Sequence, residues 1–333
     1  MAYLSDILIG LQNGFEGKTK VGTSLIKNNF YDLCIKVNGG SRNSPIIFNN
    51  QEVFLKEIPY SILFNINTLI GNSSVINLLD LLEDIGKLKE LNINLNKLFI
   101  SKNSHIIQYQ HSTEKNRNGI SKYGLENNPT YRDKYNKKGI QYGQLEYTEI
   151  MKYLKGNIIE KIDSEELIMR SKKILLYQFY SFNLDIDWGD YTISSSAHCS
   201  SGFCCSLVNP QFVNNIYGVC SVYDIYPNNC NSIVECDVLI KINDFEETLC
   251  NTAVNCNWLN LDKLIKNIKI NGVNILIITR CDILINLHKY MLYHKNVLKD
   301  FKNWKDFTEY IRKVINKIYC INQIVFSYSK INM

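Results

Sequence analysis

The chain has 333 residues and a formal net charge of +5, and its 45% apolar and 21% charged residues are typical of a globular protein rather than a disordered one. The small positive excess suits anionic ligands but is too small and scattered to indicate nucleic-acid binding. No apolar run is long enough to cross a bilayer, and residues 1–30 lack a secretory signal pattern. We therefore expect a cytoplasmic protein that enters no membrane.

The first predicted elements are a strand over Tyr3 to Ile9 and a helix over Val21 to Asn29, joined by a glycine-rich loop. This loop reads G-L-Q-N-G-F-E-G-K-T-K from Gly10 to Lys20. Its glycines let backbone N–H groups approach an anion, and its lysines and the helix N-terminus add positive charge. The pattern predicts a phosphate cradle. Its spacing is not that of G-x-x-x-x-G-K-[ST], and an ordinary turn is the alternative.

Strands and helices alternate along the rest of the chain. The predicted strands are 30–37, a hairpin of 46–48 with 53–55, 97–100, 105–109, 172–179, 217–225, 273–278 and 324–328. The predicted helices are 78–91, 146–154, 164–171, 259–270 and 301–319. This order predicts an α/β fold with a mainly parallel central sheet flanked by helices, in a single domain spanning residues 1–333. Ligand loops are expected at the C-terminal ends of the strands.

Two features of the composition leave alternatives open. Residues 113–143 are the most basic stretch, and they are either a solvated loop or a binding segment. The eleven cysteines are expected to be reduced thiols, because no signal peptide precedes them. Zinc is the alternative, but C-x-x-C spacing is missing from the nearest pairs, Cys204–Cys205, Cys230/Cys236 and Cys250/Cys256.

The glycine loop resembles a motif of a known enzyme family. N-G-F-E-G-K-T-K at 13–20 resembles the G-D-E-G-K-G-K loop of adenylosuccinate synthetase, and residues 37–43 resemble that family's G-G-x-N-A-G-H loop. Six further stretches match in the same order: 57–63, 69–72, 98–101 with His105, 128–134, 184–191 and 277–284. The resemblance implies a P-loop-NTPase-like α/β fold, a homodimer, and GTP and Mg²⁺ as cofactors.

The family reaction supplies roles for the matching positions. GTP phosphorylates the O6 of IMP, and the amine of aspartate then displaces that phosphate. The resemblance places phosphate or nucleotide contacts at Gly14, Glu16, Gly17, Lys18, Asn38, Gly39, Gly40, Lys134, Lys137 and Ser195, where Ser195 replaces a Thr. It places guanine contacts at Asp282 and Arg280, and a magnesium contact only at the Gly40 backbone. For Asp282 a helix-capping role is the alternative.

Several positions depart from the family pattern. The carboxylate that takes a proton and holds magnesium is replaced by Phe15, the imidazole near the transferred phosphoryl group by Pro45, and a base-contacting glutamine by Tyr180. The arginine-rich loop that holds aspartate precedes a tryptophan, but residues 250–257 before Trp258 contain no arginine. A dicarboxylic substrate needs charge-assisted partners, and neutral side chains replace them poorly.

Three hypotheses follow from these substitutions. The first is a divergent family member with impaired or lost ligase activity. The second is a pseudoenzyme that serves as a nucleotide-binding or structural subunit for an unidentified protein partner. The third is an active relative with a shifted substrate, as in phage branches of the family that act on a guanine nucleotide. Asp185 and Asp187 would face the same side of a strand, and the resembling family has D-I-D at this place too, so they are interpreted mainly as structural or nucleotide-proximal. His198 is a candidate replacement catalytic residue.

Overall fold

The computed structural model describes residues 3–40, 45–111, 127–145, 160–191, 193–227, 238–242, 254–318 and 320–328. Within these ranges a nine-stranded sheet has the order β17-β14-β11-β1-β10-β2-β5-β7-β9, with every neighbouring pair parallel. Its strands are β1 (Leu4–Gly10), β2 (Leu33–Lys36), β5 (Asn67–Ile70), β7 (Leu98–Ser101), β9 (Glu160–Ile162), β10 (Lys173–Ser181), β11 (Val213–Ser221), β14 (Ile275–Thr279) and β17 (Gln323–Phe326). The predicted parallel α/β architecture is confirmed.

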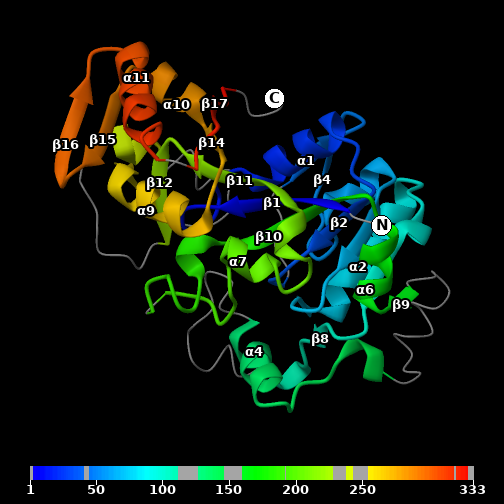
Figure 1. The fold of residues 1–333 in the computed structure, drawn as a ribbon. Coiled ribbons are helices and arrows are strands. Elements are labelled where there is room, and N and C mark those ends of the chain that lie inside the picture. The colour runs from blue at the N-terminus through cyan, green and yellow to red at the C-terminus, as the bar shows by residue number, and fades with distance from the viewer. Residues whose placement is uncertain are drawn as a thin grey trace.

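The two central strands explain why the sheet is parallel. β1 is buried from its second residue to its last, and β10 is buried at seven of its nine positions. Such continuous apolar runs belong to strands that are covered on both faces, as in parallel sheets. Figure 1 shows β1 and β10 side by side through the middle of the molecule, with helices packed around them.

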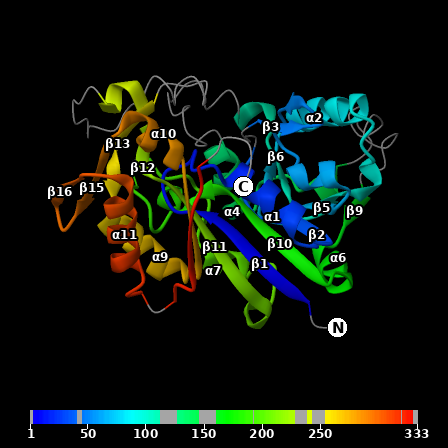
Figure 2. The same cartoon turned by 90° about the horizontal axis from the view of Figure 1, so that it is seen from above.

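Helices lie at both ends of the sheet. They are α1 (Lys18–Asn28), α2 (Leu78–Glu90), α4 (Asn128–Tyr135), α6 (Ser164–Arg170), α7 (Ser201–Cys204), α9 (Leu261–Asn271), α10 (Cys281–Leu287) and α11 (Trp304–Ile315). In Figures 1 and 2, α9, α10 and α11 group at one end, whereas α1, α2 and α6 lie at the other. The first group shares one core cluster around Leu264 and Phe307. In the second group α2 packs into a cluster around Leu81 and Ile85, whereas α1 and α6 belong to two other clusters.

A second sheet of four strands lies beside α9 and α11, and sequence patterns did not predict it. Its strands are β12 (Tyr223–Pro227), β13 (Val254–Asn260), β15 (Tyr290–His294) and β16 (Val297–Phe301). The chain also forms two-stranded sheets of β3 (Ile46–Phe48) with β4 (Gln51–Val53), and of β6 (Val75–Ile76) with β8 (His105–Ile106). Short 3₁₀ turns complete the described chain: η1 (Tyr60–Phe64), η2 (Leu95–Lys97), η4 (Tyr142–Gln144), η5 (Phe182–Leu184) and η6 (Pro210–Phe212).

Four predicted strands were wrong in extent or placement. The strand predicted over 53–55 lies earlier in the chain, at Gln51–Val53, because its hairpin turns tightly through residues 49–50. The predicted strand 217–225 is two strands in different sheets, because the Val222 N–H bonds to Thr279 O and the chain then pairs antiparallel with β13. The strand predicted from residue 30 begins only at Leu33. The strand predicted over 105–109 has only two residues.

Two further expectations concern loop residues. Asp185 and Asp187 do not lie on a strand, since they follow η5 in a turn. The predicted helix 146–154 and residues 113–126 of the basic stretch lie outside the described residues. In the described part of that stretch, α4 forms within what was predicted as either a solvated loop or a binding segment.

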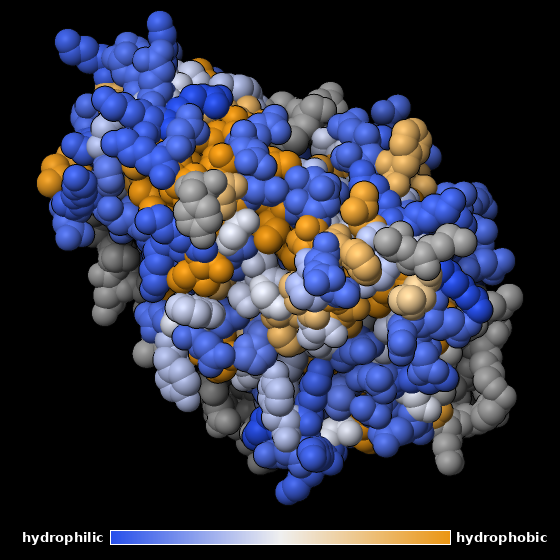
Figure 3. Space-filling view, in the orientation of Figure 1, coloured by the Kyte–Doolittle hydropathy of each residue, from blue (hydrophilic) through white to orange (hydrophobic). Residues whose placement is uncertain are grey.

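The visible face in Figure 3 is hydrophilic at its margins, with apolar side chains gathered in a band across the middle. The most exposed large apolar side chains of the described residues lie in different parts of the chain. They are Phe30, Tyr109, Tyr191 and Leu79. No described helix is long and apolar enough to span a membrane.

Candidate functional site

The glycine loop between β1 and α1 closes around an anion supplied by the loop itself. Gly17, with φ of 84°, is the N-cap of α1, and Phe15 also has a positive φ of 60°. This backbone turns the Glu16 carboxylate inward, where Oε1 accepts hydrogen bonds from the Gln12 N–H at 3.1 Å and the Gly14 N–H at 3.0 Å. Two N–H groups of the predicted phosphate loop therefore bind an internal carboxylate.

Lys18 neutralises that carboxylate. Its Nζ lies 3.1 Å from Glu16 Oε2, and both side chains are almost fully buried. Ser181, at the end of β10, donates to the same oxygen at 2.9 Å and also hydrogen-bonds Lys18 Nζ. Burial alone would raise the pKa of Glu16, but Lys18, Ser181 and backbone N–H groups hold it below the usual value. No sequence pattern pointed to Ser181, because only the sheet order brings β10 beside β1.

Phe15, which the resemblance aligns with the family's catalytic carboxylate, is partly buried against the apolar core. The Phe15 side chain packs against the cluster that contains Trp258 and Leu264. Its carbonyl oxygen accepts a hydrogen bond from the Arg280 guanidinium, and the Glu16 carbonyl accepts one from Thr279 Oγ1 at 2.7 Å. Arg280, predicted as a guanine contact, therefore binds the backbone of the first loop.

The second glycine loop, residues 38–40, is held by Asn38. Its Oδ1 accepts from the Phe179 N–H at 3.0 Å, and its Nδ2 donates to the His198 carbonyl at 2.8 Å. A Cβ at Gly40 would lie 2.2 Å from Asn127 Nδ2, so a larger residue there would displace the Asn127 side chain. Asn38 thus links this loop to β10 and to the segment that contains His198.

Tyr180 fills the space beside the second loop. Its hydroxyl accepts a hydrogen bond from Asn127 Nδ2 at 2.6 Å, and its ring would contact a Cβ on Gly39 at 3.4 Å. Burial raises the pKa of the Tyr180 hydroxyl well above its usual range, although hydrogen bonds from Asn127 and the Gly40 backbone oppose the shift. The ring belongs to a small buried cluster with Tyr131 and Cys199.

A fully buried ion pair supports the same loop, and sequence reasoning missed it. Lys36 Nζ lies 2.6 Å from Glu57 Oε2, and neither side chain is exposed to solvent. Lys36 Nζ also donates to the Gly40 carbonyl at 3.2 Å, and Glu57 Oε1 accepts from the Asn77 N–H at 2.9 Å. Because the Gly40 carbonyl already faces an ammonium group, it is a poor ligand for a cation.

The remaining predicted contacts are spread around these loops. Ser195 is buried, and its Oγ donates to the Leu184 carbonyl at 2.9 Å. Lys134 Nζ donates to the Asn72 carbonyl at 3.2 Å, and burial lowers its pKa to about 8. Lys137 is exposed after α4. Asp282 lies in the first turn of α10 and interacts electrostatically with Lys20 of α1.

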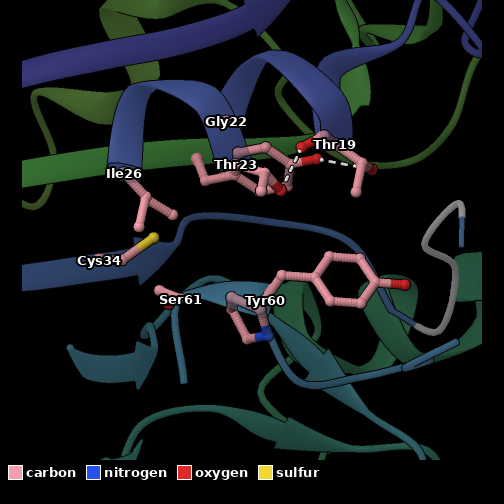
Figure 4. A pocket seen from close by; sticks show the side chains of 9 residues that line it. Thr19, Gly22, Thr23, Ile26, Cys34, Tyr60 and Ser61 are labelled. Atoms are coloured by element: carbon pink, nitrogen blue, oxygen red, sulfur yellow. Dashed lines mark hydrogen bonds between the residues drawn. The ribbon is translucent and has the colours of Figure 1, made fainter. Parts of the chain in front are cut away.

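Pro45, which the resemblance aligns with the family's histidine, is exposed. A small cavity of about 20 Å³, enough for one water molecule, lies behind the first loop between α1 and η1. Figure 4 shows Thr19 and Thr23 of α1 on one side of it and Tyr60 and Ser61 on the other. Its size excludes a nucleotide.

Comparisons with known proteins agree with the sequence resemblance. The family model for adenylosuccinate synthetase matches residues 7–166. The chain is 30% identical to the adenylosuccinate synthetase of Cytophaga hutchinsonii over 84% of this chain and 77% of that protein, and 27% identical to that of Chlorobium luteolum over 89% and 81%.

Two solved structures share the fold. The fully ligated adenylosuccinate synthetase of Plasmodium falciparum superposes with a TM-score of 0.79 at 20% identity, covering 98% of this chain and 97% of that chain. The cyanophage S-2L succinoaminodeoxyadenylate synthetase, bound to dGMP and to dATP as an energy donor, gives a TM-score of 0.76 at 13% identity, covering 99% and 94%.

Proposed function

Because this chain belongs to the adenylosuccinate synthetase family, we propose that it is a divergent member of a purine-biosynthetic ligase lineage whose GTP-driven ligation of IMP and aspartate is strongly impaired or lost. The observation that carries the proposal is the first glycine loop. Phe15 occupies the position of the family's carboxylate and packs into the core, while Glu16 is neutralised by Lys18 and Ser181. In this arrangement no carboxylate of the loop is left to accept the N1 proton from the purine base of IMP.

The residues present do not fit the family's magnesium ion. Mg²⁺ requires oxygen ligands, usually with one or two carboxylates. Phe15 offers none, Glu16 is engaged in an ion pair, and the Gly40 carbonyl accepts from the Lys36 ammonium group. These residues therefore do not provide the ligands for a magnesium ion at the first loop.

A second candidate function is a pseudoenzyme that binds a purine nucleotide or acts as a structural subunit. Lys20 supports phosphate binding, because it lies in the first turn of α1, where the helix dipole also favours an anion. The cyanophage relative, whose structure holds dGMP and dATP, supports testing these nucleotides as well as IMP and GTP. The family relation supports a cytoplasmic homodimer, which sedimentation of the purified protein would test.

The test is a calorimetric titration of the full chain with IMP, GTP, dGMP and dATP, paired with an assay for adenylosuccinate formation in the presence of Mg²⁺ and aspartate. We expect no turnover. Sustained turnover at a rate normal for a ligase would overturn the proposal.

Two variants of α1 test the second candidate function. If a nucleotide binds through the loop, Lys20→Met should weaken its binding about tenfold, whereas Lys27→Met at the far end of the same helix should leave it unchanged. Equal effects of the two substitutions, or no binding by the parent protein, would contradict nucleotide binding through the loop. The structural-subunit role would then be the remaining form of the second candidate function.

A further inference from the structure

An imidazole and two carboxylates converge in the segment that follows β10. The ligand atoms of Asp185, Asp187 and His198 all lie within 4.8 Å of one another. The two aspartates follow η5, and His198 returns to them thirteen residues after Asp185 in the chain. None of the three belongs to the Glu16–Lys18–Ser181 cluster or to the Lys36–Glu57 pair. From this convergence we propose a binding site for a divalent transition-metal ion of the zinc class.

Asp185 is the fixed part of the site. Its Oδ1 accepts hydrogen bonds from the Asp187 N–H at 2.9 Å and the Trp188 N–H at 3.2 Å, and its Oδ2 accepts one from the Cys199 N–H. The residue is only 1% exposed. Among the described residues no lysine or arginine forms an ion pair with it. A buried carboxylate that is held by N–H groups but has no counter-ion is stabilised by a bound cation.

His198 is oriented by its neighbours. Its carbonyl accepts from Asn38 Nδ2, and its ring packs on Phe203 with ring centres 5.2 Å apart. These contacts direct Nδ1 toward Asp187, whose Oδ2 lies 3.5 Å away. The His198 side chain is 35% exposed, so the site opens to solvent and an ion can enter.

Asp187 is the adjustable ligand. Two ligands of one ion about 2.1 Å from the metal cannot be more than about 4.2 Å apart, so binding requires a carboxylate to turn inward. The Asp187 side chain is 68% exposed and can rotate at little cost, whereas Asp185 is held in place.

The donor set selects the class of metal. Imidazole with carboxylates suits Zn²⁺, Co²⁺ and Ni²⁺, whereas Mg²⁺ and Ca²⁺ prefer oxygen ligands alone. The proposed site therefore differs in both its ligands and its metal from the magnesium site that the family has beside the nucleotide phosphates.

The experiment uses the full chain after removal of metals with a chelator, titrated with Co²⁺ and with Zn²⁺ by absorption spectroscopy and calorimetry. We expect one equivalent to bind with the d–d spectrum of nitrogen and oxygen ligation. His198→Ala and Asp187→Asn should each weaken binding at least about tenfold, while His288→Asn, at an exposed histidine, should leave it unchanged. His288 has a positive φ that asparagine tolerates.

Each other outcome contradicts the site. A strong thiolate-to-cobalt charge-transfer band would place the ion on the cysteines. Binding that is equal in the parent protein and both site variants, or no binding of either metal, would also overturn the proposal. Circular dichroism and melting temperatures of the metal-free variants, which should equal those of the parent protein, separate loss of the site from loss of the fold.

Discussion

At the scale of single residues, the first glycine loop depends on a buried charge pair. Glu16 accepts two backbone N–H groups, a hydroxyl and the Lys18 ammonium, so its hydrogen-bonding capacity is used within the protein. Removing one partner of such a pair leaves an uncompensated charge in the interior. The loop conformation and the stability of the protein are therefore coupled through this one side chain.

We expect Glu16→Gln to lower the free energy of unfolding by about 3–5 kcal/mol, because Lys18 is left buried without its counter-charge. Urea denaturation followed by circular dichroism measures this change. Asp163→Asn, which breaks the exposed pair with Lys102, is the matched control and should cost at most about 1 kcal/mol. Equal costs for the two variants would show that the buried pair does not support the loop.

The same pair predicts a dependence of stability on pH. The pKa of Glu16 is lowered below its usual 4.5 in the folded protein, so its contribution to stability is present above that value. The contribution is lost as the pH falls through the lowered pKa. Acid titration of the melting temperature should therefore show a steeper decline in the parent protein than in Glu16→Gln.

A second buried pair permits a double-mutant cycle. Lys36→Met and Glu57→Gln should each destabilise the protein by about 3–5 kcal/mol, since each leaves a buried charge beside Gly40. The double variant should cost clearly less than the sum of the two. Additive costs in urea denaturation would show that the two side chains are not coupled.

At the scale of elements, the start of a helix depends on the backbone conformation of the residue before it. Gly17 has φ of 84° as the N-cap of α1, where a side chain is strained, while Gly86 lies inside α2 with open space around a Cβ. We expect Gly17→Ala to lower the free energy of unfolding by about 1–2 kcal/mol. Gly86→Ala, the matched control, should raise it by about 0.5–1 kcal/mol. The same sign for both changes in urea denaturation would contradict this reasoning.

The start of α11 is fixed by a side-chain cap. Asn303 Oδ1 accepts from the Asp306 N–H at 2.9 Å. Asn303→Ala should cost about 1 kcal/mol, whereas Asn303→Asp, which keeps the acceptor, should be close to neutral. Thermal unfolding of the two variants separates loss of the cap from any other effect of the position.

At the scale of the whole molecule, one apolar cluster joins the two sheets. It includes Ile9 of β1, Cys220 of β11 and Leu276 of β14 from the central sheet, together with Trp258 of β13 and Phe307 of α11. Because these residues share one buried interior, the four-stranded sheet and the central sheet should unfold together.

Phe307→Ala tests that coupling. We expect a loss of about 3–5 kcal/mol, with the midpoint of tryptophan fluorescence and that of far-ultraviolet circular dichroism shifting together. Trp258 and Trp304 report on the cluster, whereas circular dichroism reports on every element. Phe30→Ala, at a fully exposed ring, should shift neither midpoint appreciably. A shift in fluorescence alone would mean that the C-terminal sheet unfolds independently.

Sequence patterns were sufficient for the elements whose causes are local. The apolar run at β1, the periodicity of α2 and α9 and the glycine loop before α1 predicted those elements to within a few residues. Patterns failed for β15 and β16, whose alternation is interrupted by the Lys295–Asn296 turn with positive φ at both residues. The split of 217–225 was also unpredictable, because a bond from Val222 to the distant Thr279 ends the first strand.

By itself the sequence determined the family and the parallel α/β class, because both follow from collinear motifs and from apolar runs that any fold must bury. Through the family resemblance it also predicted which catalytic side chains are replaced, since residue type is a local property. Only the tertiary structure decided what the retained residues contact. Glu16 contacts Ser181, 165 residues away in sequence, and Asn38 contacts Phe179, 141 residues away. These contacts form because β1, β10 and β2 are parallel neighbours, so their C-terminal ends lie together.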